Sequence, residues 1–182
     1  MGTVMRLFTA ALFATAVVAA GSAHAEVTPV PGLDQARYLG RWHEIARLPM
    51  FFQRNCASDV TATYSLNADG TIRVHNACKK ADGAELSADG VARQAEPGVA
   101  AQLQVRFAPA WLSWIPLVWA DYWVIALDPD YRWAMVGQPG KKYLWILSRT
   151  PTLDRVTFDM LKGKASSMGY DLSPLLISGR VE

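Results

Sequence analysis

Cysteine is scarce in this chain of 182 residues, which contains only Cys56 and Cys78. So few cysteines exclude a small scaffold held together by several disulfides. A zinc site could be assembled from His43, Cys56, His75 and Cys78. Zinc ligands usually come in closely spaced pairs, and this set contains one such pair, His75 and Cys78. We therefore predict no metal site, and the two cysteines permit one intramolecular disulfide.

An excess of one charge and the common catalytic motifs are lacking as well. The formal net charge is +2 at pH 7 and the sequence has no basic run, which argues against nucleic acid as a partner. Neither Gly-x-Ser-x-Gly nor His-Glu-x-x-His occurs, so two motifs typical of hydrolases and metalloproteases are missing. The prediction is a protein that is not an enzyme and needs no cofactor.

The N-terminus has the pattern of a secretory signal peptide. Arg6 is followed by fourteen uncharged, mostly apolar residues and then by Ala23-His24-Ala25, which predicts cleavage after Ala25. No cysteine follows the apolar segment, so a site for bacterial lipid attachment is missing. We expect residues 1–25 to be removed and residues 26–182 to form one exported, periplasmic domain, with any association with the outer membrane made without a lipid anchor.

Strand-like runs with alternating, β-branched or aromatic residues fill most of the remaining chain. Tight turns rich in Gly, Pro, Asn and Asp separate them, which makes consecutive strands antiparallel neighbours. The expected strands are residues 41–47, 58–66, 71–79, 85–94, 101–107, 121–127, 131–137 and 142–149. Eight such strands predict an all-β, up-and-down barrel, because closure removes the exposed edges of a flat sheet.

After the last strand the spacing of the apolar residues changes from two residues to three or four, which predicts a C-terminal α-helix packed outside the barrel. Pro151 precedes this segment and Gly169 ends it. A short final strand is expected near residues 176–178. The helical stripe consists of Leu153, Val156, Met160, Leu161, Ala165 and Met168.

The first strand begins with Gly40-Arg41-Trp42. Because every strand of an up-and-down barrel reverses direction, the turn at residues 128–131 and the end of the eighth strand, Arg149, should return to the end where Trp42 lies. There the guanidinium can lie on the indole face and donate hydrogen bonds to carbonyl groups. We expect Gly40, Trp42, Arg149 and the turn residues Asp130 and Tyr131 to plug this end, with Arg149 in a structural role.

The segments "GRWHEIARLP", "LDPDYRWAMVG" and "YLWILSRTP", in this order, resemble the three motifs of the lipocalin family, specifically the bacterial outer-membrane, apolipoprotein D-like group. The resemblance covers about residues 33–176. It departs from the pattern at Pro129, where the family often has Thr, and in the missing lipoprotein cysteine. It implies a barrel that binds fatty acids, lysophospholipids or other small hydrophobic ligands, and it implies that Trp145 lines the cavity.

Apolar residues alternate with polar ones along the expected strands, which predicts an inward face. Val60, Ala62 and Tyr64 share this face on one strand, and Thr61 and Thr63 lie opposite. The same parity gives inward sets of Ile72, Val74 and Asn76, of Leu103, Val105 and Phe107, and of Tyr122, Val124 and Ala126. From these positions we predict that Tyr64, Val74, Asn76, Phe107 and Tyr122 bind the ligand with Trp145. A filled apolar core without a cavity is the alternative reading of the alternation.

The opposite end should be the open mouth, with Phe51 and Phe52 in "LPMFFQRN" and an uncharged stretch of thirteen residues at 108–120. Trp111, Trp114 and Trp119 make this stretch strongly apolar. It is interpreted either as a loop folded over the barrel and buried, or as a lid or rim that touches a membrane.

Two further residues carry expectations. Cys56 and Cys78 lie nearly opposite each other across a hairpin that turns at residues 67–70, so we predict a disulfide between them. Glu44 shares parity with Trp42 and could point into the barrel, where a carboxylate must be paired or protonated. An ion pair or access to solvent is favoured for it over ligand recognition.

Three function classes stay open. The leading prediction is a carrier or store of small hydrophobic ligands in the cell envelope, involved in membrane maintenance. The alternatives are an enzyme acting on an apolar substrate inside the barrel, and an interaction protein that docks through residues 108–120. The sequence predicts no oligomeric state.

Overall fold

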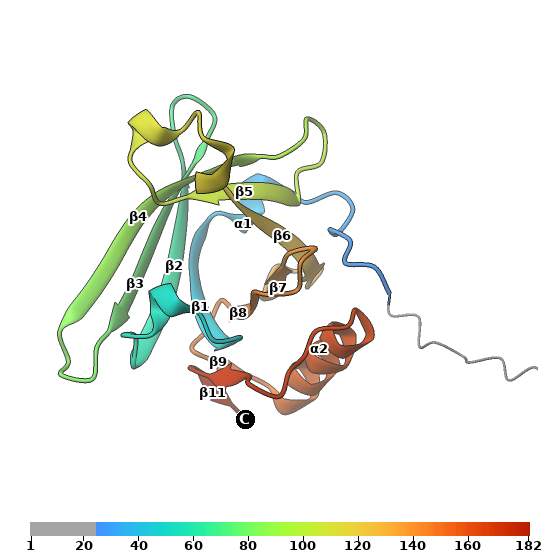
Figure 1. The fold of residues 1–182 in the computed structure, drawn as a ribbon. Helices are drawn as coiled ribbons and strands as arrows, with labels where there is room; N and C mark the ends of the chain where they lie inside the picture. The colour runs from blue at the N-terminus through green and yellow to red at the C-terminus, as the bar shows by residue number, and fades with distance from the viewer. Residues whose placement is uncertain (1–24) are drawn as a thin grey trace, which may run out of the picture.

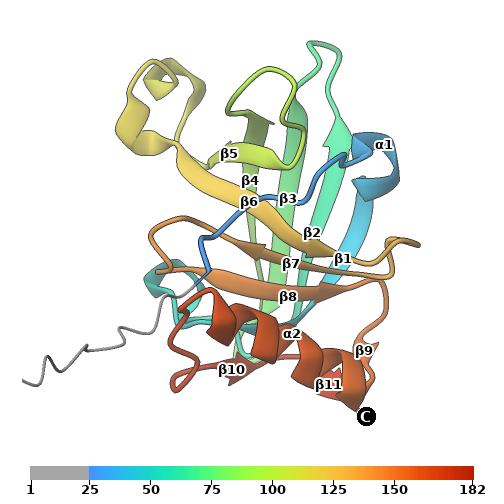
Figure 2. The same cartoon turned by 90° about the vertical axis from the view of Figure 1, so that its right-hand side faces the viewer.

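The computed structural model describes residues 25–182, which form a closed, eight-stranded antiparallel barrel with a helix packed on its outside (Figures 1 and 2). Strand β1 pairs with both β2 and β8, and this closes the sheet. The predicted fold is therefore confirmed. The predicted signal peptide lies outside the described residues except for Ala25. The barrel strands are β1 (Gly40–Arg47), β2 (Ser58–Leu66), β3 (Ile72–Lys79), β4 (Glu85–Gln94), β5 (Gln102–Arg106), β6 (Ala120–Leu127), β7 (Trp133–Gly137) and β8 (Leu144–Ser148).

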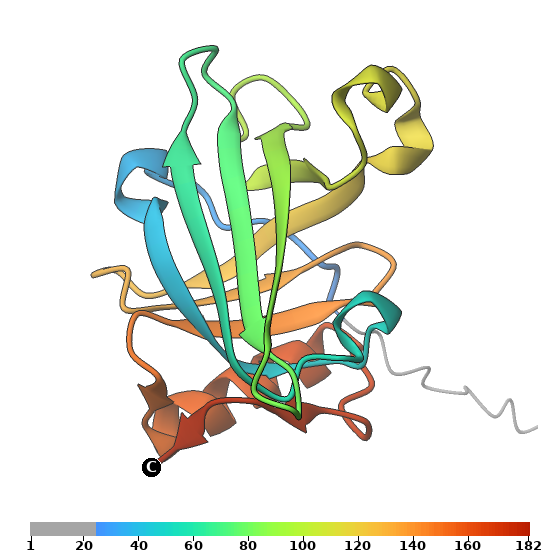
Figure 3. The same ribbon diagram turned by 90° about the vertical axis from the view of Figure 1, so that its left-hand side faces the viewer.

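Short elements complete the two ends of the barrel. Helix α1 (Gln35–Tyr38) lies at one end, and the turns η1 (Phe51–Gln53), η2 (Ala110–Leu112) and η3 (Pro116–Val118) lie at the other (Figure 3). The expected final strand is present as β10 (Leu176–Ile177), paired with β1. Strands β9 (Thr152–Leu153) and β11 (Arg180–Val181) were not predicted, because two residues are too few to show a period.

Helix α2 (Arg155–Ser167) packs on the outer face of the barrel (Figure 2). Its buried residues are Phe158, Leu161 and Ala165, and they meet Ile45, Met135 and Ile146 in one apolar cluster. The predicted stripe is wrong at two positions, since Val156 is 80% exposed and Met160 is 45% exposed. The buried face runs through Phe158, and this turns both residues toward solvent. No helix in residues 25–182 is long and apolar enough to cross a membrane.

Bulges in β1 and β6 shift the inward parity of these strands. In β6 the pairing with β7 slips between Val124 and Ala126. Val124 packs inside the barrel, whereas Ile125 and Ala126 pack toward α2. The prediction that Ala126 points inward is wrong, because one inserted residue moves the following side chains to the opposite face.

Arg149 holds the closed end of the barrel together. Its guanidinium carbon lies 3.8 Å from the centre of the Trp42 ring, and Trp42 is fully buried. The same group donates hydrogen bonds to the carbonyls of Arg41 at 2.9 Å, Arg37 at 2.7 Å and Tyr38 at 3.3 Å. These carbonyls belong to α1 and the first residues of β1. The cation therefore joins the end of the eighth strand to the start of the first.

Gly40 makes room for this contact. Its φ of +92° is a left-handed conformation, and a Cβ there would lie 3.4 Å from Nη1 of Arg149. Side chains other than Gly rarely adopt this backbone conformation. The Gly-x-Trp segment thus supplies both the strained start of β1 and the ring that Arg149 covers.

The turn between β6 and β7 depends on Asp128 rather than on Asp130. Asp128 is buried, and its carboxylate accepts hydrogen bonds from the backbone N–H groups of Asp130 and Arg132 and from the Arg132 side chain. The side chain of Asp130 is 76% exposed, so the place predicted for it in the plug is corrected to Asp128. Tyr131 does join the closed end, where its hydroxyl accepts a hydrogen bond from the Asp34 N–H at 2.8 Å.

The predicted disulfide between Cys56 and Cys78 is confirmed, with the two Cα atoms 5.6 Å apart. It joins the segment before β2 to the end of β3 at the open end of the barrel. A crosslink across 22 residues stabilises the fold by about 3 kcal/mol in the chain-entropy model.

Arg149→Ala is expected to lower the free energy of unfolding by about 1–3 kcal/mol, because the stacked cation and its hydrogen bonds to the carbonyls of Arg37, Tyr38, Arg41 and Tyr131 are lost together. Arg149→Lys is the matched variant: it keeps the charge but not the planar fork, and should recover only part of the loss. Urea unfolding of all three proteins measures this. Equal stability of wild type and Arg149→Ala would show that Arg149 does not hold the closed end.

Candidate functional site: the barrel cavity

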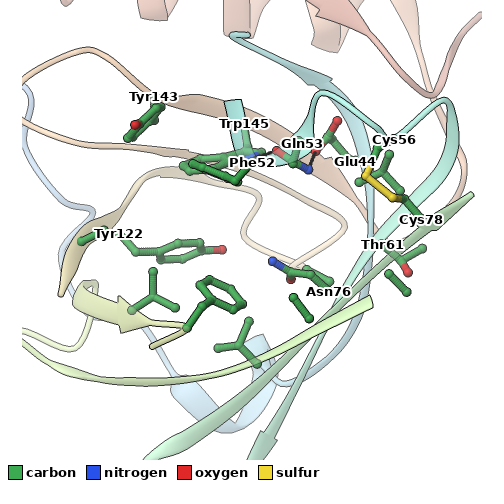
Figure 4. A pocket seen from close by; sticks show the side chains of 18 of the residues that line it. Glu44, Phe52, Gln53, Cys56, Thr61, Asn76, Cys78, Tyr122, Tyr143 and Trp145 are labelled. Carbon is green, nitrogen blue, oxygen red and sulfur yellow. Dashed lines mark hydrogen bonds between the residues drawn. A yellow bond between two sulfur atoms is a disulfide. The ribbon is translucent and has the colours of Figure 1, made fainter. Parts of the chain in front are cut away.

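A cavity of about 530 Å³ opens at the end of the barrel that carries η1, and it is lined by β-strand side chains and the mouth loops (Figure 4). The barrel is therefore hollow, and the alternative of a completely filled core does not hold. Every residue predicted to bind the ligand is among the lining residues: Tyr64, Val74, Asn76, Phe107, Tyr122 and Trp145. That they contact a ligand stays a prediction.

Several lining residues were not identified from the sequence. Thr61 was expected on the outer face but lines the cavity, because the pairing of β2 with β3 is irregular between Ser58 and Thr61. Gln53 and Tyr143 come from loop segments, where no alternation predicts direction. Leu86 belongs to β4, which is so polar that no alternation of apolar and polar residues predicts its inward face.

A continuous series of aromatic rings runs from the mouth of the cavity to the closed end. Neighbouring ring centres lie between 5.1 and 6.2 Å apart, the range in which aromatic pairs attract each other. The series is Phe51, Phe52, Tyr143, Trp145, Tyr122, Tyr64, Tyr38 and Trp42. One wall of the cavity is therefore a rigid, largely apolar surface that leads inward from solvent.

Three tyrosine hydroxyls meet at the inner end of this wall. The hydroxyl of Tyr122 lies 2.9 Å from that of Tyr38 and 2.8 Å from that of Tyr64. Burial raises the pKa of Tyr64 to about 12, and burial also raises the pKa of Tyr38 and of Tyr122. All three therefore stay neutral hydrogen-bond donors at physiological pH.

Glu44 anchors a second polar group nearer the mouth. The bulge in β1 sets Glu44 opposite Leu147 and Arg47 opposite Trp145, so both side chains face the interior. Arg47 Nη1 donates to Glu44 Oε1 at 2.6 Å, and this is the ion pair favoured for Glu44 from the sequence. In a regular strand, residues three positions apart point to opposite faces, so spacing alone would not pair Glu44 with Arg47. The bulge in β1 brings both side chains to the same face.

Gln53 ties the η1 turn to this ion pair. Its Nε2 donates to Glu44 Oε2 at 2.9 Å, and its Oε1 accepts from the Trp145 indole at 3.2 Å. Ser178 donates to the other carboxylate oxygen at 2.6 Å. Both carboxylate oxygens of Glu44 thus accept hydrogen bonds from the protein, and η1 is held across part of the mouth.

The charged residues that line the cavity are acidic. Glu44 is paired with Arg47, and Asp121 lies at the start of β6. Among the described residues that line the cavity there is no Lys, Arg or His. Within residues 25–182, no three His, Cys, Asp or Glu side chains are grouped closely enough to hold a metal ion.

Two loops at the mouth, η1 and the segment between β5 and β6 (Figure 3), carry apolar side chains that are exposed. Phe51 is 73% exposed in η1, and Trp111, Trp114 and Leu117 are 74%, 77% and 93% exposed in the loop between β5 and β6. Phe52 is half-exposed and packs on Tyr143. The interpretation of residues 108–120 as a buried loop is therefore wrong for these tryptophans.

Trp119 differs from the other two tryptophans of this loop. Arg93 stacks on its ring at 3.9 Å and Arg106 lies 5.2 Å from it, while its indole N–H donates to the carbonyl of Ser113. Arg106 itself is only 7% exposed. Trp119 anchors the loop to the barrel, and Trp111 and Trp114 project from it.

Tyr64→Phe provides a test of the buried hydroxyls. Because the pKa of Tyr64 is higher in the folded state than in the unfolded state, its contribution to stability is complete below about pH 10 and is lost as the pH rises toward 12. The stability advantage of wild type over Tyr64→Phe should therefore shrink by about 1.4 kcal/mol per pH unit in this interval. Denaturant unfolding of both proteins at a series of alkaline pH values measures it. A difference that does not vary with pH would contradict the burial of this hydroxyl.

Comparison with known proteins places this geometry in a family. A family model described as a lipocalin-like domain matches residues 33–178. The chain is 46% identical to temperature-induced lipocalin-1 of Arabidopsis thaliana over 152 residues, which are 82% of this chain and 81% of that protein. It is 41% identical to the outer membrane lipoprotein Blc of Escherichia coli K12 over 152 residues, with the same coverage. It is 33% identical to apolipoprotein D of Rattus norvegicus over 150 residues, 78% of this chain and 74% of that one.

Solved structures agree on the architecture. Insecticyanin from the tobacco hornworm Manduca sexta has a TM-score of 0.61 at 19% identity, over 88% of this chain and 92% of its own. Lobster apocrustacyanin A1 has a TM-score of 0.60 at 16% identity, over 80% and 79%. At such low identity these likenesses show the fold alone. The family model and the sequence relatives show more: the chain belongs to the lipocalin family, whose members bind small hydrophobic ligands.

Proposed function

We propose that this protein binds one long-chain acyl ligand, a fatty acid or a lysophospholipid, inside the barrel and carries or stores it in the cell envelope. The observation that supports this most is the cavity of about 530 Å³, open at the mouth and closed at the other end by Trp42 and Arg149. Its size falls within the range of small-molecule sites, and apolar and aromatic side chains dominate its lining.

The expected affinity is micromolar. A chain of sixteen carbons could gain roughly 12 kcal/mol by burial, at about 0.8 kcal/mol per CH₂. Association and ordering of the chain cost several kcal/mol. The remainder approaches the value of about 8 kcal/mol that corresponds to micromolar binding.

The charges of the lining support one orientation of the ligand. Among the described residues that line the cavity there is no Lys, Arg or His to pair with a carboxylate or phosphate that entered deeply, and Arg47 is already bonded to Glu44. A desolvated anion without a partner is strongly disfavoured. The charged end of the ligand therefore stays at the mouth in water, and the acyl tail points toward the tyrosines.

Binding without catalysis is the function that the lining favours. No histidine lines the cavity, and Cys56 and Cys78 are joined in a disulfide. The described lining therefore offers no thiolate nucleophile and no imidazole base, two groups common in covalent catalysis. The lining gives no support to the alternative of an enzyme that acts on an apolar substrate inside the barrel.

A place in the cell envelope fits the relatives and the N-terminus. The relatives include proteins named outer membrane lipoproteins, and residues 1–25 have the pattern of a signal peptide. The cysteine that lipid attachment requires does not follow the apolar segment. We place the mature protein in the periplasm, near the outer membrane.

Calorimetric titration with palmitate and butyrate tests the cavity. Palmitate should bind with micromolar affinity and butyrate at least a hundredfold more weakly, because butyrate has too few methylenes to offset the cost of association. Val74→Trp fills the cavity and should abolish palmitate binding, since Val74 lines it and is buried. Arg73→Trp is the matched control: Arg73 precedes Val74 but is exposed, so this variant should bind like wild type.

Near-ultraviolet circular dichroism confirms that each variant is folded. Equal affinity for palmitate and butyrate, or palmitate binding that survives in folded Val74→Trp, would place the ligand outside the barrel. The loop between β5 and β6 would then be the next site to test.

A membrane-touching rim is the second candidate function. Trp111, Trp114 and Phe51 project at the open end, where a ligand must enter, and Trp favours the bilayer interface. Trp119 fixes the loop that carries the two exposed tryptophans. Contact of this rim with a membrane would let an acyl chain pass from lipid to cavity without crossing water.

The double variant Trp111→Ser/Trp114→Ser should weaken binding to zwitterionic phospholipid vesicles by about tenfold or more, because two large side chains lose their partial burial in lipid. Val156→Ser/Met160→Ser removes two exposed apolar side chains from α2, away from the mouth, and should leave vesicle binding unchanged. Co-flotation with vesicles measures both. Equal losses in the two variants would show that the rim is not the contact surface.

A further inference from the structure

Three polar side chains project into the inner part of the cavity and are not needed to hold an unmodified acyl chain. Tyr64 and Tyr122 line it with buried rings, and Asn76 lies on the neighbouring strand β3. Burying polar groups in an apolar site is unfavourable unless they are hydrogen-bonded. Their hydrogen-bonding capacity is therefore informative about the ligand.

The three tyrosine hydroxyls have one more donor proton than the hydrogen bonds among them use. Tyr38, Tyr64 and Tyr122 supply three O–H donors, and two contacts join them. Within residues 25–182 they form no other side-chain hydrogen bond. Because Tyr64 and Tyr122 line the cavity whereas Tyr38 does not, an acceptor for the third proton is most accessible from the cavity.

Asn76 supplies a second polar group. Figure 4 shows the amide of Asn76 and the hydroxyl of Tyr122 projecting into the same space. The Oδ1 of Asn76 is covered by protein, so its Nδ2 is the atom that faces the cavity. A second donor therefore lies beside the spare tyrosine proton.

The strand register places these groups within reach of one small ligand group. Tyr64 pairs with Val74, and Asn76 is two residues farther along β3 on the same face. Such diagonal neighbours are about 7–8 Å apart. One oxygen between the two side chains can reach both.

We infer that Tyr64, Tyr122 and Asn76 form a subsite for an uncharged hydroxyl on the tail of the acyl ligand. The hydroxyl oxygen accepts the spare tyrosine proton and a proton of the Asn76 amide. A carboxylate could accept both as well, but it would carry its charge into a part of the cavity where no described lining residue is a cation. The inference rests on the proposed function, because the charged end of the ligand must stay at the mouth for the tail to reach this subsite.

The test compares hexadecanoate with 16-hydroxyhexadecanoate and 12-hydroxyhexadecanoate by calorimetric titration. All three share the carboxylate and the chain length, so the ratio of their dissociation constants isolates the tail hydroxyl. A purely apolar cavity would bind the hydroxylated acids more weakly. The subsite predicts that at least one of them binds about 3- to 10-fold more tightly than hexadecanoate, which is the typical gain from one net hydrogen bond.

Asn76→Leu and the double variant Tyr64→Phe/Tyr122→Phe should each remove this preference, measured as the ratio of the dissociation constants of the hydroxylated acid and hexadecanoate in the same variant, and near-ultraviolet circular dichroism checks that each variant is folded. Tyr143→Phe is the matched control: it removes a hydroxyl from the same aromatic wall near the mouth and should keep the preference.

The outcomes separate the subsite from the proposed function. If hexadecanoate binds but neither hydroxylated acid binds more tightly, the subsite is refuted and acyl binding stands. A preference that persists in both Asn76→Leu and the double tyrosine variant also overturns the assignment. If no acid binds to wild type, the proposed function itself fails.

Discussion

Strand β1 is hydrogen-bonded on both of its edges, and the rest of the molecule depends on this double pairing. Gly40 to His43 pair with β2, and His43 to Arg47 pair with β8. The change of partner along one strand closes the barrel and removes its free edges. It also sets the two ends apart: Trp42 and Arg149 seal the end where β1 begins, and Glu44 and Arg47 lie toward the end where it leaves the barrel.

The cavity has different chemistry at its two ends because of this arrangement. At the inner end the polar groups are neutral, since burial keeps the tyrosines protonated. Nearer the mouth they are charged but paired, with Glu44 bonded to Arg47, Gln53 and Ser178. The aromatic wall connects the two regions. An acyl molecule with its charge in water and its tail inside matches this distribution of polarity.

The sequence predicted the regular parts of the molecule and missed the parts that depend on irregular or distant contacts. The eight strands follow from alternation, and the meeting of Trp42 with Arg149 follows from counting reversals. The inward positions in β3 and β5 were predicted because these residues keep a two-residue period, whereas Thr61 of β2 was misplaced because the pairing of β2 with β3 is irregular there. Ala126 was misplaced because a bulge interrupts that period. Ser178 is 134 positions from Glu44, and no local pattern could have joined them. The hydroxyl of Tyr38 was missed because α1 has only four residues, and the separate role of Trp119 depends on stacking with Arg93 from another strand.

Native mass spectrometry of the exported protein, purified without added lipid and then mixed with palmitate, tests the central claim most directly. The account predicts one acyl molecule per chain, either retained from the host or taken up on mixing, because one cavity of about 530 Å³ is available. It also predicts that this adduct is missing from folded Val74→Trp. A chain that stays free of ligand under both conditions, or an adduct that persists when the cavity is filled, would contradict it.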